Sequence, residues 1–330
     1  MIQALIFLHT FFIPVNTEKD SIHTYHINGF AQGTSYHIAY FSKSSIINQN
    51  EIDELLSSID SSLSLYKSYS LINRFNLEHR GIKMDPHFKQ VILKSIDISA
   101  STNGAFDITC KPAIQLWNAA LSLNKIPSRQ QIKRVLNYVG YKHLSIKGDS
   151  LIKNNPNVQI DCDGIAQGYS VDQIATLLLK NNINDFIIEL GGEVFAHGKP
   201  QDKNSWHTSV QSSSSQRMLS DAYIIALNNA ALTTSGSMNK FIRIGNNYYS
   251  HIYNPITGKP IQEKIISVTI LANDAITADA LDNALMVMGT KTAFEWLKNY
   301  PSIGAFIVYE NKEGKILTIS NPLFDRFLVR

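Results

Sequence analysis

The sequence predicts an α+β fold in which mainly antiparallel sheets pack against helices. Apolar runs of strand length occur in closely spaced pairs more often than they alternate with helical patterns. This arrangement argues against a doubly wound parallel sheet. The sequence has no internal repeat, and no stretch after residue 20 has the composition of an interdomain linker. We therefore expect residues 21–330 to form a single domain.

Composition limits the classes of function. The chain has 330 residues, of which 44% are hydrophobic, and this is enough to bury a large core. The net charge is +3 and no run of Lys and Arg alternates with aromatic residues, so we expect no nucleic-acid partner. Cys110 and Cys162 are too few for a disulfide framework, and we expect both to pack near the site as small apolar residues.

Residues 1–20 differ from the rest of the chain. An apolar stretch is followed by the polar residues Asn16–Asp20, which is typical of a secretory signal or an uncleaved anchor. A Lys- or Arg-bearing start and a small-x-small cleavage site are missing, and a misplaced start codon would give a similar pattern. We expect export, to the periplasm or to the outer face of the inner membrane.

Local periodicity predicts the individual elements in order. Residues 34–40 alternate like a half-buried strand, and Gly148-Asp149 is a turn signal inside a hairpin over residues 144–153. Apolar residues at helical spacing predict three helices, over residues 52–63, 88–96 and 128–138. Further strands are predicted at 185–190, 206–210, 222–228, 240–252, 265–271, 303–309 and 315–319.

The most informative stretch covers residues 158–172. Val158–Ile160 predicts a short buried strand, and a helical pattern begins directly after Asp161, Asp163 and Gly164. Backbone N–H groups at such a junction point at ligands, and the two carboxylates offer negative charge to a cation or to a flavin N–H. In an alternative interpretation, Asp163 caps the helix and the glycines only permit close packing.

A second acidic element lies at residues 277–289, which predict a helix that ends at Gly289. Asp279 and Asn283 are one turn apart and lie on the same face. A carboxylate and an amide carbonyl are hard oxygen ligands, which suit Mg²⁺ better than Zn²⁺. The alternative is that Thr277 caps the helix and Asp279 complements its dipole.

Seven sequence blocks, spread in order over most of residues 30–290, resemble the FAD:protein FMN transferase (ApbE) family. The blocks are Gln32-Gly33-Thr34; Leu65-Tyr66 with Ser70 and Asn73–Asn76; Gly104–Thr109 with Pro112 and Trp117; Asp161–Tyr169; Glu189–Glu193; Thr234-Ser235-Gly236; and His251–Gly258 with Ala278–Asn283. Each block is weak alone, but their joint order and spacing make the resemblance strong. The resemblance implies a T-fold-like architecture.

Enzymes of this family cleave the pyrophosphate of FAD, attach FMN to a threonine hydroxyl of a partner flavoprotein and release AMP. The resemblance therefore implies FAD as a substrate, Mg²⁺ as a cofactor and an acceptor flavoprotein as a partner. Family members typically serve membrane redox complexes and other exported flavoproteins, so we expect the acceptor to be a subunit of such a complex.

The resemblance also implies roles for particular residues. Mg²⁺ would be held by Asp279, Asn283 and the backbone carbonyl of Gly164. Residues expected to contact FAD are Gln32, Tyr66, Ala105, Phe106, Asp107, Asp161 and Gln167. His251 is the candidate general base for the threonine hydroxyl, and Asp279 is the second candidate catalytic residue. The alternative for His251 is a structural histidine in a strand.

The chain departs from the family pattern at several positions. Asn283 stands where Thr is usual, Gln167 where Lys or Glu is usual, Gln32 where Met is usual, and Asn254 where Asp is usual. None of these changes removes the metal carboxylate or the glycines, so we expect an active enzyme. Two alternatives stay open, which are an Mg²⁺-dependent FAD pyrophosphatase that forms FMN and AMP, and an FAD-binding protein without turnover.

Overall fold

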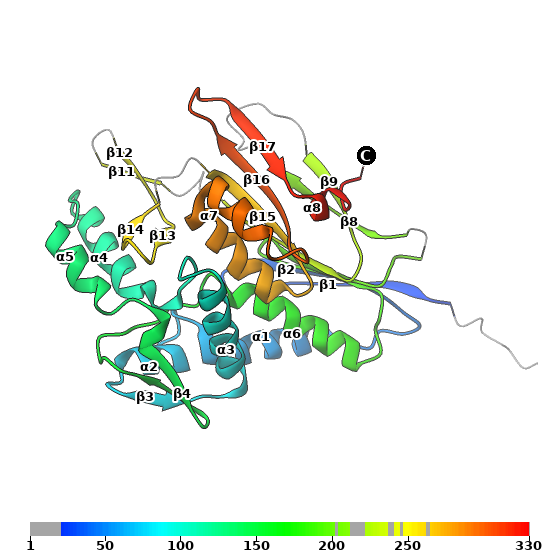
Figure 1. Cartoon of the computed structure of the whole chain (residues 1–330). Helices are drawn as coiled ribbons and strands as arrows, with labels where there is room; N and C mark the ends of the chain where they lie inside the picture. Colours follow the sequence, from blue (N-terminus) through cyan, green and yellow to red (C-terminus); the bar gives the residue numbers. More distant parts are fainter. Residues whose placement is uncertain are drawn as a thin grey trace, which may run out of the picture.

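The computed structural model describes residues 21–201, 204–211, 222–236, 241–244, 247–261 and 265–329 (Figure 1). The predicted signal or anchor segment, residues 1–20, lies outside the described residues. No helix of the described part combines the length and apolar character needed to cross a membrane.

The centre of the fold is an eight-stranded sheet with the order β1-β2-β6-β7-β10-β15-β16-β17. Every neighbouring pair is antiparallel, which confirms the predicted α+β class. The strands are β1 (His23–Ala31), β2 (Thr34–Ser42), β6 (Phe186–Leu190), β7 (Glu193–His197), β10 (Ala230–Gly236), β15 (Ile265–Ala272), β16 (Gly304–Glu310) and β17 (Ile316–Ser320).

A layer of helices covers one face of this sheet (Figure 1). Its members are α1 (Gln49–Leu63), α6 (Ala166–Lys180) and α7 (Ala275–Leu297), and α3 (Pro86–Ser101) packs on α1 and α7. Alternate residues of β2, such as Tyr36 and Ile38, belong to the same buried core as Ile52 and Leu56 of α1. Full burial of an aliphatic side chain contributes about 1.5–3 kcal/mol, so this core fixes the helices against the sheet.

The opposite face carries a second core under the hairpin of β8 (Trp206–Gln211) and β9 (Ala222–Leu227) and the short helix α8 (Pro322–Asp325). Leu232 and Phe306 of the sheet pack there with Ile225 and Phe324. The neighbouring residue Ala231 belongs to the first core, so β10 is buried on both faces.

The remaining elements surround the helix layer. They are α2 (Leu71–Leu77), β3 (Gly81–Lys83), η1 (Ile108–Cys110), α4 (Lys111–Ser122), α5 (Arg129–Leu136), η2 (Tyr141–His143), β4 (Leu144–Lys147), β5 (Ser150–Lys153), β11 (Phe241–Ile244), β12 (Asn247–Ser250), β13 (Tyr253–Asn254) and β14 (Lys259–Pro260). The hairpin predicted around Gly148-Asp149 is confirmed, because β4 and β5 pair on either side of it. Helix α5 begins after Ser128, whose side chain caps it.

The prediction of a strand at Val158–Ile160 is wrong. The segment is buried, but its backbone groups bond side chains and the backbone carbonyl of Asn155 instead of a neighbouring strand. Asn76 donates to the carbonyl of Ile160 at 2.9 Å and accepts its N–H at 2.7 Å, and the ammonium of Lys153 donates to the carbonyl of Val158 at 2.9 Å. Apolar periodicity cannot distinguish a strand from an extended segment that distant side chains hold.

Two further expectations need correction, and one is confirmed. Helix α7 is capped by Asp274 and not by Thr277, whose backbone N–H the Asp274 carboxylate accepts at 2.8 Å. The predicted helix end at Gly289 is confirmed, since Gly289 has the non-helical angles φ 76° and ψ 157°; a second helical segment follows directly across this kink and continues to Leu297. The single strand expected over residues 240–252 is instead the β11–β12 pair, although residues 240 and 245–246 lie outside the described residues.

Candidate active site

A large cavity of about 1860 Å³ opens between the helix layer and the ends of β7 and β10. It is lined by every residue that the sequence analysis assigned to the site: Gln32, Tyr66, Ala105, Phe106, Asp107, Asp161, Gly164, Gln167, His251, Asp279 and Asn283. Ligand sites commonly measure about 300–1,000 Å³, so this cavity has room for a dinucleotide and for part of a second molecule.

The position of Asp279 depends on close packing between α6 and α7. A Cβ atom placed on Gly168 would lie 2.3 Å from the carbonyl oxygen of Ala275 and 2.8 Å from the Cβ of Asp279. Only glycine permits this approach, and it lets the backbone N–H of Gly168 donate to the Asp279 carboxylate at 2.9 Å. The carboxylate is 4% exposed.

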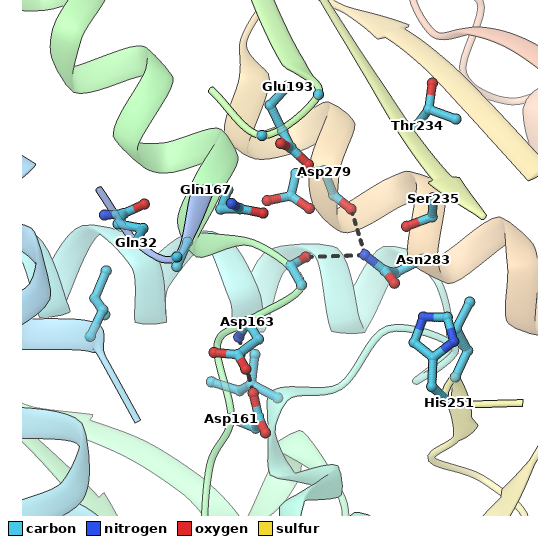
Figure 2. A pocket seen from close by; sticks show the side chains of 18 of the residues that line it. Gln32, Asp161, Asp163, Gln167, Glu193, Thr234, Ser235, His251, Asp279 and Asn283 are labelled. Carbon is cyan, nitrogen blue, oxygen red and sulfur yellow. Dashed lines mark hydrogen bonds between the residues drawn. The ribbon is translucent and has the colours of Figure 1, made fainter. Parts of the chain in front are cut away.

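One turn further along α7, Asn283 faces Gly164 (Figure 2). Its amide nitrogen lies 3.5 Å from the carbonyl oxygen of Gly164 and donates to the backbone carbonyl of Asp279 at 3.0 Å. The three predicted metal ligands are therefore adjacent. The amide would have to turn by half a rotation to direct its oxygen at a cation held with Gly164 and Asp279.

Two further buried acids lie beside Asp279, and the sequence analysis gave neither of them a primary role. Glu193 begins β7, and one of its carboxylate oxygens is buried without a hydrogen-bond partner among the described residues. Asp282 accepts the hydroxyl of Thr233 at 2.8 Å and the hydroxyl of Ser235 at 2.9 Å. Glu193 lies in a sequence block of the family resemblance, which was the available signal.

Burial and mutual repulsion raise the pKa values of these carboxyls. Burial raises the pKa of Asp279 to about 7, and the charges of Asp172 and Asp163 contribute. Burial and the neighbouring charge of Asp279 raise the pKa of Glu193 and of Asp282 well above the ordinary values. A group of buried carboxyls without a cationic neighbour is a favourable place for a bound cation.

The charge of the whole cavity leads to the same conclusion. Among the described residues, its lining contains seven acidic side chains and one lysine, Lys67; the acids are Asp53, Asp60, Asp107, Asp161, Asp163, Glu193 and Asp279. Within that part of the chain, no group of three His, Cys, Asp or Glu side chains is arranged to hold a metal. A cation at Asp279 would therefore need the carbonyl of Gly164 and the side chain of Asn283, which are suitable oxygen donors for Mg²⁺.

The residues expected at the flavin occupy different depths. Tyr66 lies at the mouth of the cavity and is 87% exposed, whereas Phe106 is buried and adds only part of its ring to the wall. Gln32 donates to the hydroxyl of Ser170 at 2.9 Å, and its side-chain oxygen is buried without a partner among the described residues. Gln167 lies against Gly191, on the same side of the cavity as Gln32 (Figure 2). Tyr66 is thus accessible for stacking, and Gln32 offers an unused acceptor.

Asp107 and Asp161 differ in what their carboxylates already hold. Asp107 accepts the backbone N–H and the hydroxyl of Thr109 at 2.9 and 2.6 Å, and the backbone N–H of Tyr141 at 2.6 Å. Both carboxylate oxygens of Asp107 are thus used to hold the loops of Thr109 and Tyr141, which leaves Asp107 less able to bind a ribose hydroxyl. Among the described residues, Asp161 accepts only the N–H of Asp163, at 3.0 Å, so it retains capacity for a ligand.

His251 lies between β12 and β13, on the side of the cavity where Ser235 and Asn283 are found (Figure 2). Its side chain is exposed and lines the same cavity as Asp279. The position fits a residue that acts on a second molecule entering the cavity, because the histidine is not enclosed in the core.

Comparison with known proteins identifies the family of this chain. A family model described as the ApbE family matches residues 32–307. FAD:protein FMN transferase of Vibrio cholerae is 32% identical over 274 residues, which cover 80% of this chain and 81% of that protein. The enzyme of the same name from Haemophilus influenzae is 29% identical over 314 residues, or 91% and 90% of the two chains.

Solved structures give the same result. The flavin transferase ApbE from Vibrio cholerae superimposes with a TM-score of 0.81 at 28% identity, over 93% of this chain and 100% of that one. The flavinyl transferase ApbE from Pseudomonas stutzeri, in its apo form, gives a TM-score of 0.82 at 28% identity, over 93% and 97%. With the family model covering most of its length, this chain belongs to the ApbE family.

Proposed function

We propose that this protein transfers FMN from FAD to a threonine hydroxyl of an acceptor flavoprotein and releases AMP. Membership of the ApbE family and relatives named FAD:protein FMN transferase support this function. The observation that carries it is the buried Asp279 carboxylate beside the Gly164 carbonyl and Asn283, in an acidic cavity large enough for FAD.

Mg²⁺ suits this site because the pyrophosphate of FAD is anionic and the cavity lining is acidic. Asp279, the Gly164 carbonyl and the Asn283 side-chain oxygen would hold the ion. When bound, Mg²⁺ would offset negative charge on the pyrophosphate and on the departing AMP. The Glu193 oxygen that has no partner among the described residues supports a cation at this position, since a buried carboxylate without a partner is costly.

The chain's own residues would position the two substrates. Tyr66 would stack on the flavin at the mouth of the cavity, while Gln32, Gln167 and Asp161 would bond its polar edge or the ribityl and ribose hydroxyls. The threonine Oγ attacks the phosphorus on the FMN side, the bond from that phosphorus to the bridging oxygen breaks, and AMP leaves with that oxygen. His251 would accept the threonine proton.

We also propose, from residues 1–20, that the protein is exported and acts on an exported flavoprotein, such as a subunit of a membrane redox complex. This placement would bring the enzyme and acceptor together in one compartment. Fractionation of cells with an antibody against this protein tests it, and recovery of the protein only in the cytosol would contradict it.

The decisive experiment combines the protein, FAD, Mg²⁺ and a threonine-bearing acceptor domain, then measures AMP and in-gel flavin fluorescence of the acceptor. Transfer predicts both signals, and both should disappear in EDTA; acceptor labelling should also disappear when its threonine is replaced by alanine. AMP without labelled acceptor would indicate a pyrophosphatase, and binding without AMP would indicate a storage protein. His251→Gln should lower transfer by roughly 10²–10⁴-fold with little change in FAD affinity.

A further inference from the structure

Strand β10 is longer than its neighbour β7, and this leaves part of one strand edge open in the middle of the sheet. Residues Ala230–Leu232 pair with β7, whereas pairing with β15 continues to Gly236. In the part of the chain that the structure describes, no strand pairs with Thr233–Gly236 on the β7 side. We call Thr234–Gly236 on this side the open edge.

The direction of the backbone groups follows from the turn between β6 and β7. Leu190 and Glu193 close a two-residue turn, so their backbone groups bond each other, and alternation directs those of Val194 toward β10. Val194 is opposite Leu232. The same alternation directs the N–H and C=O groups of Thr234 and Gly236 to the β7 side.

A second observation gives the same direction. The hydroxyls of Thr234 and Thr269, which are opposite each other on β10 and β15, lie 2.9 Å apart. Side chains approach closely in the non-hydrogen-bonded pairs of an antiparallel ladder, in which the backbone groups point away from the partner strand. Thr234 therefore directs its backbone groups away from β15 and toward the open edge.

The open edge lies in the candidate active site. Thr234, Ser235 and Gly236 line the cavity together with Asp279 and Asn283 of α7 on one side and with Ser209 and Val210 of β8 on the other. The hydroxyls of Thr233 and Ser235 bond the two oxygens of Asp282, between Asp279 and Asn283 on α7. These bonds fix the edge relative to α7, and Figure 2 shows Thr234 and Ser235 on the strand next to Asp279 and Asn283, which would hold the pyrophosphate.

We propose that the open edge binds the acceptor, with the segment around its threonine added as a short extended strand beside Thr234–Gly236. This inference rests on the proposed function, since it specifies how the second substrate enters the site. A strand edge offers N–H donors and C=O acceptors in alternation, which complements another peptide backbone. A phosphate would use only the donors and would leave the C=O acceptors of the edge unpaired.

The geometry also orients the threonine. Side chains of an added strand alternate between the two faces of the sheet. On one face they approach α7 with Asp279 and Asn283, and on the other they approach Ser209 and Val210. The reacting threonine belongs on the α7 face, so its two neighbours in the acceptor contact β8.

The test replaces Thr234 by proline, which removes one open-edge N–H that bonds neither β7 nor β15. Thr24→Pro is the matched control. Ala31 and Thr34 close the two-residue turn between β1 and β2, and the same alternation, counted back from Ala31, directs the Thr24 N–H to the outer edge of the sheet, away from β2. We expect Thr234→Pro to lower kcat/KM for the acceptor domain roughly tenfold or more, with the Kd for FAD unchanged within about twofold. Thr24→Pro should leave both values unchanged.

Equal acceptor kinetics in Thr234→Pro and wild type would overturn the proposal, as would a loss explained by weaker FAD binding. Should Thr234→Pro not fold, the wild-type enzyme is assayed instead with synthetic peptides that span the acceptor threonine. Each peptide is N-methylated at one residue. Loss of labelling at alternate positions supports an added strand, and loss at every position or at none overturns it. Failure of the wild-type enzyme to label any unmodified acceptor would instead reject the proposed function.

Discussion

At one end of the contact between α6 and α7, Asp172 accepts the backbone N–H groups of Ala275 and Ile276 at 2.8 and 2.9 Å. One turn further along α7, Asp279 accepts the backbone N–H of Gly168. Both carboxyls are removed from most solvent, and burial raises the pKa of each to about 7. They differ in how many of their oxygens the protein itself satisfies.

This difference separates a structural carboxylate, Asp172, from the carboxylate for which we propose a function, Asp279. Both oxygens of Asp172 are used at the start of α7, where they add to the cap by Asp274 and fix the helix along α6. Asp279 retains capacity and lies beside the buried acids Glu193 and Asp282. Gly164, Gly168 and Asp172 follow one another at intervals of four residues, so their contacts with α7 lie on the same side. The contact at Asp172, the structural end, therefore sets the position of Asp279, the functional end.

The largest expected effect is at the functional end. Asp279→Ala should lower Mg²⁺-dependent AMP release by about 10³-fold or more, because the anionic pyrophosphate would lose its cation. The melting temperature should be unchanged or higher, since the substitution removes a charge that repels Glu193 and Asp282. Kinetics over a range of Mg²⁺ and calorimetry check both parts. Wild-type turnover at saturating Mg²⁺ would remove Asp279 from the site.

A substitution between the two ends should affect both properties. Gly168→Ala places a Cβ atom 2.3 Å from the Ala275 carbonyl, so the helices must move apart. We expect a loss of about 1–3 kcal/mol in unfolding free energy and a weaker Mg²⁺ dependence of activity. Gly164→Ala is the control, because its Cβ would meet only the Asn283 side chain, at 3.0 Å. Equal stability of the two variants in urea would contradict this account of the helix contact.

At the structural end the expected effect is smaller and depends on pH. Burial raises the pKa of Asp172 from 3.8 to about 7, so the folded chain holds this proton more tightly than the unfolded chain. Its contribution to the free energy of unfolding is therefore fully present below pH 4 and is lost as the pH rises to 7. Asp172→Asn should reduce the loss of unfolding free energy between pH 4 and pH 7 by roughly 1–3 kcal/mol. Urea unfolding at several pH values tests it, with the exposed Asp149→Asn as control.

The elements that sequence periodicity predicted are those with a strong pattern of their own, such as α1, α3 and the hairpin of β4 and β5. Strands β7 and β10 were missed. Ala230–Gly236 has few β-branched or aromatic residues, and its strand conformation depends on pairing with β7 and β15. Helix α4 was also missed, although Pro112 in its first turn and the buried Trp117 were noted for the family resemblance.

The site residues were predicted in part because they fall in sequence blocks with recognisable glycines and carboxylates. The roles of Asp282 and Glu193 could not be predicted in the same way. Asp282 acts with Thr233 and Ser235, about 50 residues earlier in the chain, and only the pairing of β10 with its neighbours brings these hydroxyls to α7. Asp107 and Asp161 gave the same signal in the sequence, and only the contacts of Thr109 and Tyr141 distinguish them.

The smallest expected effect concerns the residue next to the functional end. Asn283 donates through one amide nitrogen to the carbonyls of Asp279 and Gly164 and to Asp282. Threonine, the usual residue of the family at this position, would lose these bonds but offer a hydroxyl oxygen without needing to turn. We therefore expect Asn283→Thr to preserve or raise the affinity for Mg²⁺, by less than about tenfold. Titration of AMP release with Mg²⁺ measures this change. A large loss of activity at saturating Mg²⁺ would mean that the amide has another role, such as a direct contact with FAD.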